Sequence, residues 1–280
     1  MSELRRFVQV DVFTAEPLKG NPLAVVVDAA GLSDQQMADF ARWTNLSETT
    51  FLLPPTDPAA DYRVRIFTPG GELPFAGHPT LGSAHAWLAA GGDPKKPAMV
   101  VQQCAIGLVK VRREGGRLSF SAPPLTRSGA ADAATREQVL RSLRIGADEL
   151  LDLQWVCNGP EWLAARLRSA QAVLALKPDF VAMAGLKLGV VGAHASGGAC
   201  DFEVRAFVPD LGVPEDPVTG SLNAGLALWM QEAGLAAPRY VAAQGTAMGR
   251  AGRVHVSRDP GGSTWIGGDV QPLVHGQVRL

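Results

Sequence analysis

One segment of this 280-residue chain occurs twice, and that repeat constrains the fold more than any other feature. Residues 61–69 read DYRVRIFTP, and residues 201–209 read DFEVRAFVP. In both copies apolar side chains alternate with the period of a β-strand, and the run ends at a proline, which cannot donate to a strand ladder. The repeat predicts two similar halves, each built around an equivalent strand.

The similarity continues beyond these strands. Residues 77–86 read GHPTLGSAHA, and residues 215–224 read EDPVTGSLNA. Aligning the prolines and the Gly-Ser pairs of the two segments places His78 opposite Asp216. This alignment predicts that His78 and Asp216 occupy matching positions in the two halves.

Each copy then enters a stretch of small and apolar residues, at 80–88 and at 220–232, and each stretch ends near glycine, as many helices do. Both stretches are apolar on almost every side, so we expect two buried helices, each enclosed by a sheet. A helix N-terminus offers free N–H groups and about half a positive charge. Two such ends at a cleft between the halves would bind an anion such as a carboxylate.

Local patterns predict the remaining elements. An amphipathic helix is expected at 32–43, with Ser33 as its N-cap, and a counterpart at 177–184. The Pro- and Ala-rich segment 122–135 is typical of a linker, so we expect domains at 1–122 and 123–280, with the final strand able to pack back on the first domain. Further strands are expected at 7–13, 24–27, 49–53, 100–111, 152–157, 172–176, 188–193 and 253–256.

Charge and cysteine content exclude several function classes. The 26 basic residues nearly cancel the 27 acidic ones, so no basic field attracts nucleic acid or a membrane surface. We see no apolar run that could span a bilayer and no signal peptide. Cys104, Cys157 and Cys200 form no CxxC pair and are expected to be buried thiols in a reducing compartment. We therefore expect a cytoplasmic protein that acts on a small molecule.

Motifs for common cofactors and nucleophiles are missing from the sequence. No GxGxxG, Walker A or GxSxG pattern occurs, so nucleotide binding and serine-hydrolase chemistry lack support. His78 and His85 are seven residues apart, and no further ligand completes a metal site with them. The sequence predicts neither a cofactor nor a metal ion.

Four segments, in order, resemble the signature segments of the PhzF family of phenazine biosynthesis. They are Gly20-Asn21-Pro22, Ser47-Glu48-Thr49-Thr50-Phe51, Gly77-His78-Pro79-Thr80 and Glu215-Asp216-Pro217-Val218-Thr219-Gly220-Ser221. The resemblance implies an α+β, diaminopimelate epimerase-like fold of two pseudo-symmetric domains, each with sheet wrapped around a central helix. It also implies a homodimer without cofactor that isomerises a small carboxylate, as in the conversion of trans-2,3-dihydro-3-hydroxyanthranilate.

The same resemblance assigns roles to individual residues. It implies Glu48 as the glutamate that shuttles the proton, with His78, Asp216 and Ser221 in support, and with the backbone of Gly77 and Gly220 close to the ligand. Diaminopimelate epimerase and its racemase relatives use a cysteine in each half at the equivalent loops. This chain has no cysteine there, which disfavours a two-cysteine racemase.

The residues by themselves leave alternatives open. The neighbours of Glu48 are uncharged, so a dry pocket could raise its pKa toward neutrality, but most glutamates are solvated surface residues. His78 could equally cap or pack a helix, and Asp216 could simply begin one. Two further functions fit the same residues: epimerisation or isomerisation of another amino or hydroxy acid, and binding of a small acid without catalysis.

Overall fold

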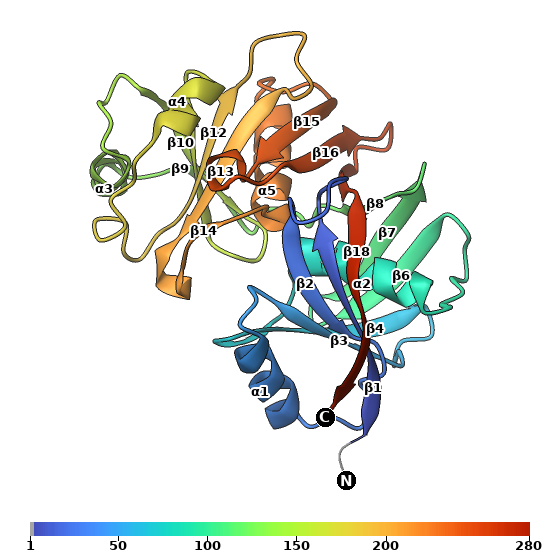
Figure 1. The fold of residues 1–280 in the computed structure, drawn as a ribbon. Helices are drawn as coiled ribbons and strands as arrows, with labels where there is room; N and C mark the ends of the chain where they lie inside the picture. Colours follow the sequence, from blue (N-terminus) through green and yellow to red (C-terminus); the bar gives the residue numbers. More distant parts are fainter. Residues whose placement is uncertain (1–2) are drawn as a thin grey trace. The chain divides into compact units, whose positions relative to one another are not determined.

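The computed structural model describes residues 3–280, which form two compact units (Figure 1). Unit 1 comprises the chain up to Ser121 together with Gly267–Leu280, and unit 2 comprises Ala122–Ile266. The elements of unit 1 are β1 (Leu4–Val12), β2 (Asn21–Val26), α1 (Asp34–Thr44), β3 (Thr49–Leu53), β4 (Tyr62–Thr68), β5 (Gly71–Leu73), α2 (Gly77–Ala89), β6 (Met99–Cys104), β7 (Gly107–Glu114), β8 (Arg117–Ser121) and β18 (Val270–Arg279).

Unit 2 repeats the order of β1 to β8 in β10 to β17, preceded by β9 and α3, and β17 crosses the boundary at Ile266. Its elements are β9 (Arg127–Ala130), α3 (Ala133–Leu143), β10 (Leu150–Cys157), β11 (Trp162–Leu167), α4 (Ala170–Ala175), β12 (Lys187–Ala193), β13 (Phe202–Val208), a 3₁₀ turn (Pro209–Leu211), β14 (Val213–Asp216), α5 (Gly220–Glu232), β15 (Arg239–Gln244), a second 3₁₀ turn (Thr246–Met248), β16 (Gly252–Arg258) and β17 (Thr264–Gly268).

The strand pairings of the two units correspond one to one. In unit 1, β1 is antiparallel to β18 and β2, β2 is parallel to β3, β3 is antiparallel to β4, and β4 is parallel to β6. In unit 2, β10 is antiparallel to β9 and β11, β11 is parallel to β12, β12 is antiparallel to β13, and β13 is parallel to β15. The duplication predicted from the sequence is therefore confirmed at the level of the sheets.

Asp61 and Asp201, the first residues of the two repeats, form the same pair of hydrogen bonds. The Asp61 N–H donates to the Val101 carbonyl over 2.8 Å, and the Val101 N–H donates to Asp61 Oδ2 over 2.7 Å. Asp201 and Val241 exchange the same two bonds, both over 2.8 Å. Each repeat thus begins by locking its strand to the parallel strand that follows the buried helix.

A buried helix covers one face of each sheet, and an outer layer covers the other. Side chains of a strand alternate between faces, so Tyr62 turns toward α2, where its ring stacks on Trp87 at 5.3 Å. Phe51 turns to the opposite face and meets Phe40 of α1 edge-on. Both α2 and α5 are buried along most of their length, as their all-round apolar sequences predict.

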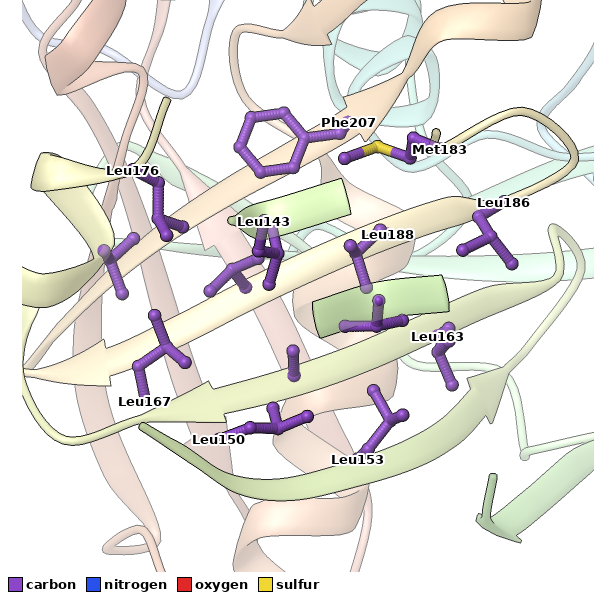
Figure 2. Packing of buried hydrophobic residues seen from close by; sticks show 14 residues of the cluster. Leu143, Leu150, Leu153, Leu163, Leu167, Leu176, Met183, Leu186, Leu188 and Phe207 are labelled. Atoms are coloured by element: carbon purple, nitrogen blue, oxygen red, sulfur yellow. The ribbon is translucent and has the colours of Figure 1, made fainter. Parts of the chain in front are cut away.

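The outer layer of unit 2 is a leucine-rich cluster. Figure 2 shows leucine side chains from three neighbouring strands beneath Phe207 and Met183. Val139 and Leu143 of α3 and Val173 of α4 complete the contact. Burial of these side chains holds the two short helices on the sheet.

The two buried helices show that the sequence alignment was wrong in this region. Both helices span 13 residues and begin at Gly77 and Gly220, so Gly77 corresponds to Gly220 and His78 corresponds to Ser221. Asp216 ends β14, outside the helix. The 3₁₀ turn inserted between β13 and β14 lengthens the second copy, and the chance match of two Gly-Ser pairs concealed that insertion.

Polar contacts within the helices support this structural alignment. The Thr80 hydroxyl donates to the Ala76 carbonyl and accepts from Gln102 of β6. Asn223, at the corresponding place in α5, donates to the Thr219 carbonyl and to Gln244 of β15. The match of these two networks fixes the register of the duplication.

Several local predictions are confirmed and others are wrong. Ser33 caps α1 in a capping box with Gln36. Residues 172–176 were expected to be a strand but lie largely in α4, because the Ser169 hydroxyl caps that helix. Residues 177–184, all described, form a loop followed by turns in place of the expected helix, with Asp179 accepting from the Val181 and Ala182 N–H groups.

Two other segments contain more structure than expected. The single strand expected at 100–111 is a hairpin of β6 and β7, which turns at residues 105–106. The expected linker 122–135 contains β9 and the start of α3, whose N-cap is Asp132. The hairpin was missed because its turn, Ala105-Ile106, contains none of the residues that usually mark a turn, and the helix was missed because its cap, Asp132, is a single residue in an Ala-rich stretch.

Candidate active site

Unit 1 places Glu48 beside His78. Glu48 directly precedes β3, so strand alternation turns it to the same face as Thr50, whose hydroxyl bonds to Ser83 of α2. His78 is the second residue of α2. Glu48 Oε2 lies 3.5 Å from His78 Nε2, and the two side chains are only 16% and 5% exposed. Two of the residues expected at the site are therefore in contact.

The buried environment of Glu48 raises its pKa. Burial raises the pKa of Glu48 to about 7, and a hydrogen bond from Ser47 opposes that rise. Within the described residues, Glu48 Oε2 is buried and has no hydrogen-bond partner. A carboxyl group with a pKa near neutrality can both accept and return a proton at physiological pH.

Two further polar residues complete this cluster, and the reasoning from single residues missed both. Asn21 Nδ2 lies 3.4 Å from His78 Nδ1, and the Ser47 hydroxyl donates to Asn21 Oδ1 over 3.4 Å. Ser47, Glu48, His78 and Asn21 therefore form a closed ring of contacts. Asn21 and Ser47 lie in the two segments, 20–22 and 47–51, that resemble the PhzF signature segments. Their place in those segments was the only sequence signal for them.

Unit 2 places Asp216, Gly220 and Ser221 on the connection from β14 to α5. The Asp216 carboxylate accepts from the Thr219 hydroxyl over 2.5 Å. Gln244 of β15 donates to the Asp216 carbonyl and accepts from the Thr219 N–H. Gln244 thus fixes this connection, although nothing in its sequence surroundings pointed to it.

The N-termini of both buried helices lack side-chain caps. Ala76 and Thr219, the N-cap residues in the described chain, make no side-chain cap bond. The first helical residues, Gly77 and Gly220, carry no side chain that could cover their N–H groups. Uncapped N–H groups at a helix start favour a bound anion, so each unit offers a place for a carboxylate.

Ser221 is held by a tryptophan. Trp162 Nε1 donates to Ser221 Oγ over 2.9 Å, and Asn158 Nδ2 donates to the Ser221 carbonyl over 2.9 Å. The Ser221 hydroxyl oxygen is the acceptor in the bond from Trp162, and a hydroxyl group that accepts one hydrogen bond can still donate another. Trp162 and Asn158 are further residues that the sequence did not reveal.

The cysteines are unpaired, and one differs from the prediction. Cys104 and Cys157 are buried thiols, but Cys200 is partly exposed, because it lies in the turn before β13. In the part of the chain that the structure describes, no three His, Cys, Asp or Glu side chains are grouped to hold a metal ion. No helix among the described residues is long and apolar enough to cross a membrane.

Comparison with known proteins identifies relatives along almost the whole chain. The family model for phenazine biosynthesis-like protein (PhzC-PhzF) matches residues 10–266. "Antisense-enhancing sequence 1" of Schizosaccharomyces pombe is 33% identical, over 97% of this chain and 97% of that protein. Trans-2,3-dihydro-3-hydroxyanthranilate isomerase of Pseudomonas chlororaphis is 36% identical, over 82% of this chain and 81% of the isomerase.

Solved structures agree with the fold. A phenazine biosynthesis protein of the PhzF family from Enterococcus faecalis is 25% identical, with a TM-score of 0.81 and complete coverage of both chains. A hydroxyproline epimerase from Agrobacterium vitis shares the fold at 15% identity, with a TM-score of 0.59 over 99% of this chain and 93% of that chain. The chain therefore has the diaminopimelate epimerase-like α+β fold, and it belongs to the phenazine biosynthesis-like PhzF family of isomerases.

Proposed function

We propose that this isomerase moves a proton between carbon atoms of a small cyclic or amino-acid-like carboxylate, with Glu48 as the proton carrier. The observation that carries the proposal is the buried Glu48 carboxyl, whose pKa is raised to about 7 next to His78. Relatives at 36% identity are named trans-2,3-dihydro-3-hydroxyanthranilate isomerases, so a substrate of that chemical class is the one we propose.

The proposed reaction needs no external oxidant or reductant. Ionised Glu48 takes a proton from an activated carbon, and the electron pair of that C–H bond passes into the conjugated system. Protonated Glu48 then returns the proton to another carbon of the same molecule. Substrate and product are isomers, and Glu48 ends each cycle ionised, as it began.

The other residues bind and orient the substrate in this proposal. His78 and Asp216 hydrogen-bond its polar substituents. The uncapped N–H groups at Gly77 and Gly220 and the Ser221 hydroxyl bind its carboxylate. Binding of these groups restrains the substrate for proton transfer.

The direct test is replacement of Glu48 by Gln, with trans-2,3-dihydro-3-hydroxyanthranilate as substrate. The amide keeps the shape but cannot carry the proton, so turnover should be abolished while ligand affinity stays within about tenfold. The exposed Glu114→Gln is the matched control and should keep full activity. An active Glu48→Gln protein would exclude Glu48 as the proton carrier.

Solvent exchange separates an enzyme from a protein that only binds its ligand. In deuterium oxide, the native protein should place deuterium on a carbon of the ligand, and Glu48→Gln should not. If the C–H bonds of a tightly bound ligand stay unlabelled with the native protein, the chain is a binder. Labelling without a shifted double bond would indicate epimerisation.

We also infer that the protein is a cytoplasmic homodimer. The support is its three unpaired cysteines and its membership of the family. Light scattering on the full chain should give twice the 29.5 kDa of one copy. A mass of one copy at micromolar concentration would contradict the dimer.

A further inference from the structure

The two units hold the second residue of their buried helix in the same way. In unit 1 the first residue of β2, Asn21, presents its amide nitrogen to His78. In unit 2 the first residue of β11, Trp162, presents its indole N–H to Ser221. β2 and β11 are equivalent strands, and His78 and Ser221 are equivalent helix positions. Two different donors at one place in the duplicated fold point to a shared task, which is orientation of the helix residue.

We propose that Asn21 is a positioning residue that keeps His78 neutral, with its ring proton on Nε2, the nitrogen that faces Glu48. This inference rests on the proposed function of Glu48. An amide nitrogen only donates hydrogen bonds, so the ring nitrogen opposite Asn21 Nδ2 must be an unprotonated acceptor. The single proton of the neutral ring is then on Nε2, 3.5 Å from Glu48 Oε2.

The protonation state of His78 decides how good a base Glu48 is. A cationic ring at this distance would favour the carboxylate and lower the pKa of Glu48. With a neutral ring, burial is the dominant influence on the pKa of Glu48. Burial raises that pKa to about 7. Asn21 therefore preserves the basicity of a residue that it does not touch.

The charged groups Arg6, Arg113, Glu114 and Arg117 lie at the far end of α2 from His78, beside residues 85–90. The remaining titratable groups that face α2 are neutral or lie elsewhere. Burial raises the pKa of Tyr62 and of Cys104, which face α2 from β4 and β6, so both are neutral near pH 7. Burial and then the charge of His275 on β18 lower the pKa of His85 within α2. Asp11 of β1 alternates with two valines that contact α2, so it lies on the opposite face of the sheet, where it accepts from the Gly20 N–H.

Nitrogen NMR on the resting protein tests the proposal without any substrate. Protein labelled with ¹⁵N in histidine, compared with His78→Gln, isolates the two ring nitrogens of His78 at pH 7.5. We expect a bare Nδ1 and a protonated Nε2. A proton on Nδ1, or on both nitrogens, would overturn the proposal whatever the outcome for catalysis.

Replacement of Asn21 by Asp tests the consequence for Glu48. The new carboxylate accepts a hydrogen bond, so it draws a proton to Nδ1 and makes the ring cationic. The acid limb of kcat/KM, set by Glu48, should move down by about one pH unit or more, and the plateau should fall about tenfold or more. An acid limb at the native pH, in a folded variant, would contradict the proposal.

Trp162→Phe is the matched control from the other unit. It removes the equivalent donor, whose partner is the Ser221 hydroxyl and not a histidine, so KM should rise while the acid limb stays at its native pH. If Asn21→Asp does not fold, Asn21→Ala takes its place. In that variant the ring is no longer restricted, so NMR should show protonation of Nδ1 in part of the molecules; an unchanged bare Nδ1 would overturn the proposal.

Discussion

At the scale of single residues, the burial that suits Glu48 to its proposed role also destabilises the fold. The pKa of this carboxyl rises from an ordinary value of 4.5 to about 7 because the folded chain buries it. Below pH 4.5 it is protonated in both the folded and the unfolded state and carries no penalty. Between pH 4.5 and 7 the unfolded chain ionises first, so native stability falls as the pH rises.

Replacement of Glu48 by Gln should therefore change stability in a pH-dependent way. Gln cannot ionise, so the free energy of unfolding of Glu48→Gln does not carry this penalty. Relative to the native protein, it should be about 3 kcal/mol higher at pH 8 than it is at pH 4. Urea unfolding at both pH values measures the difference, and Glu114→Gln serves as the control. Equal stability differences at pH 4 and pH 8 would show that the pKa of Glu48 is not raised.

At the scale of elements, each buried helix reaches its sheet through a glycine. A Cβ on Gly82 of α2 would lie 2.5 Å from Leu23 Cδ2, the end of a flexible side chain. A Cβ on Gly225 of α5 would lie 2.3 Å from the Val156 carbonyl oxygen, which is backbone. The two glycines are equivalent in the duplication, but Leu23 lies on β2 and Val156 on β10, the counterpart of β1, and only the Leu23 side chain can move aside.

This difference predicts unequal effects of the same substitution. Alanine favours a helix over glycine by about 1 kcal/mol, which partly offsets the clash at Gly82. Gly225→Ala should lower the free energy of unfolding by about 1–3 kcal/mol more than Gly82→Ala does, because overpacking against backbone displaces the helix. Thermal unfolding of the two variants compares them directly. Equal costs would show that the Val156 backbone yields as easily as Leu23.

A second pair of equivalent elements is joined by an arginine and a glutamate. Arg205 of β13 forms a two-pronged bond with Glu215 of β14 and donates to the Val173 and Leu176 carbonyls of the α4 segment. Arg65 and Glu72 repeat the arrangement in unit 1. The Arg205 pair is about 10% exposed or less, whereas Arg65 is 23% exposed and Glu72 37%.

The arginine pair provides a matched prediction. Arg205→Met leaves the Glu215 carboxylate buried without its partner and should cost about 3–5 kcal/mol. Arg65→Met should cost under about 1 kcal/mol, because water reaches Glu72. Urea unfolding gives both values. Because Glu215 precedes Asp216, Arg205→Met should also raise KM; similar stability losses in both variants would contradict the assigned difference in burial.

At the scale of the whole molecule, the C-terminal strand belongs to the fold of unit 1. β18 pairs with β1 along its length, from Arg279 opposite Leu4 to Val270 opposite Val12. Deletion of residues 270–280 should therefore expose the β1 amides to hydrogen exchange while β12 of unit 2 stays protected. Deletion of residues 279–280 alone is the control. Equal loss of protection in β12 would show that the two units unfold together.

Local sequence determined a large part of this structure. Strand alternation, the Ser33 cap and the all-round apolar helices depend on neighbouring residues, so the duplicated strands, α1 and the buried helices could be predicted. Glu48 and His78 could be named as candidates from a resemblance in short segments. Their roles, and those of Gly77, Asp216, Gly220 and Ser221, stay proposals.

Tertiary structure decided what depends on residues far apart in the chain. The true register of α2 and α5 follows from contacts with Gln102 and Gln244 on later strands, and the partners Asn21 and Trp162 lie 57 and 59 residues from His78 and Ser221. The raised pKa of Glu48 is also a tertiary property. Loss of water around a carboxyl group depends on the surfaces that enclose it, and no pattern of adjacent residues encodes that enclosure.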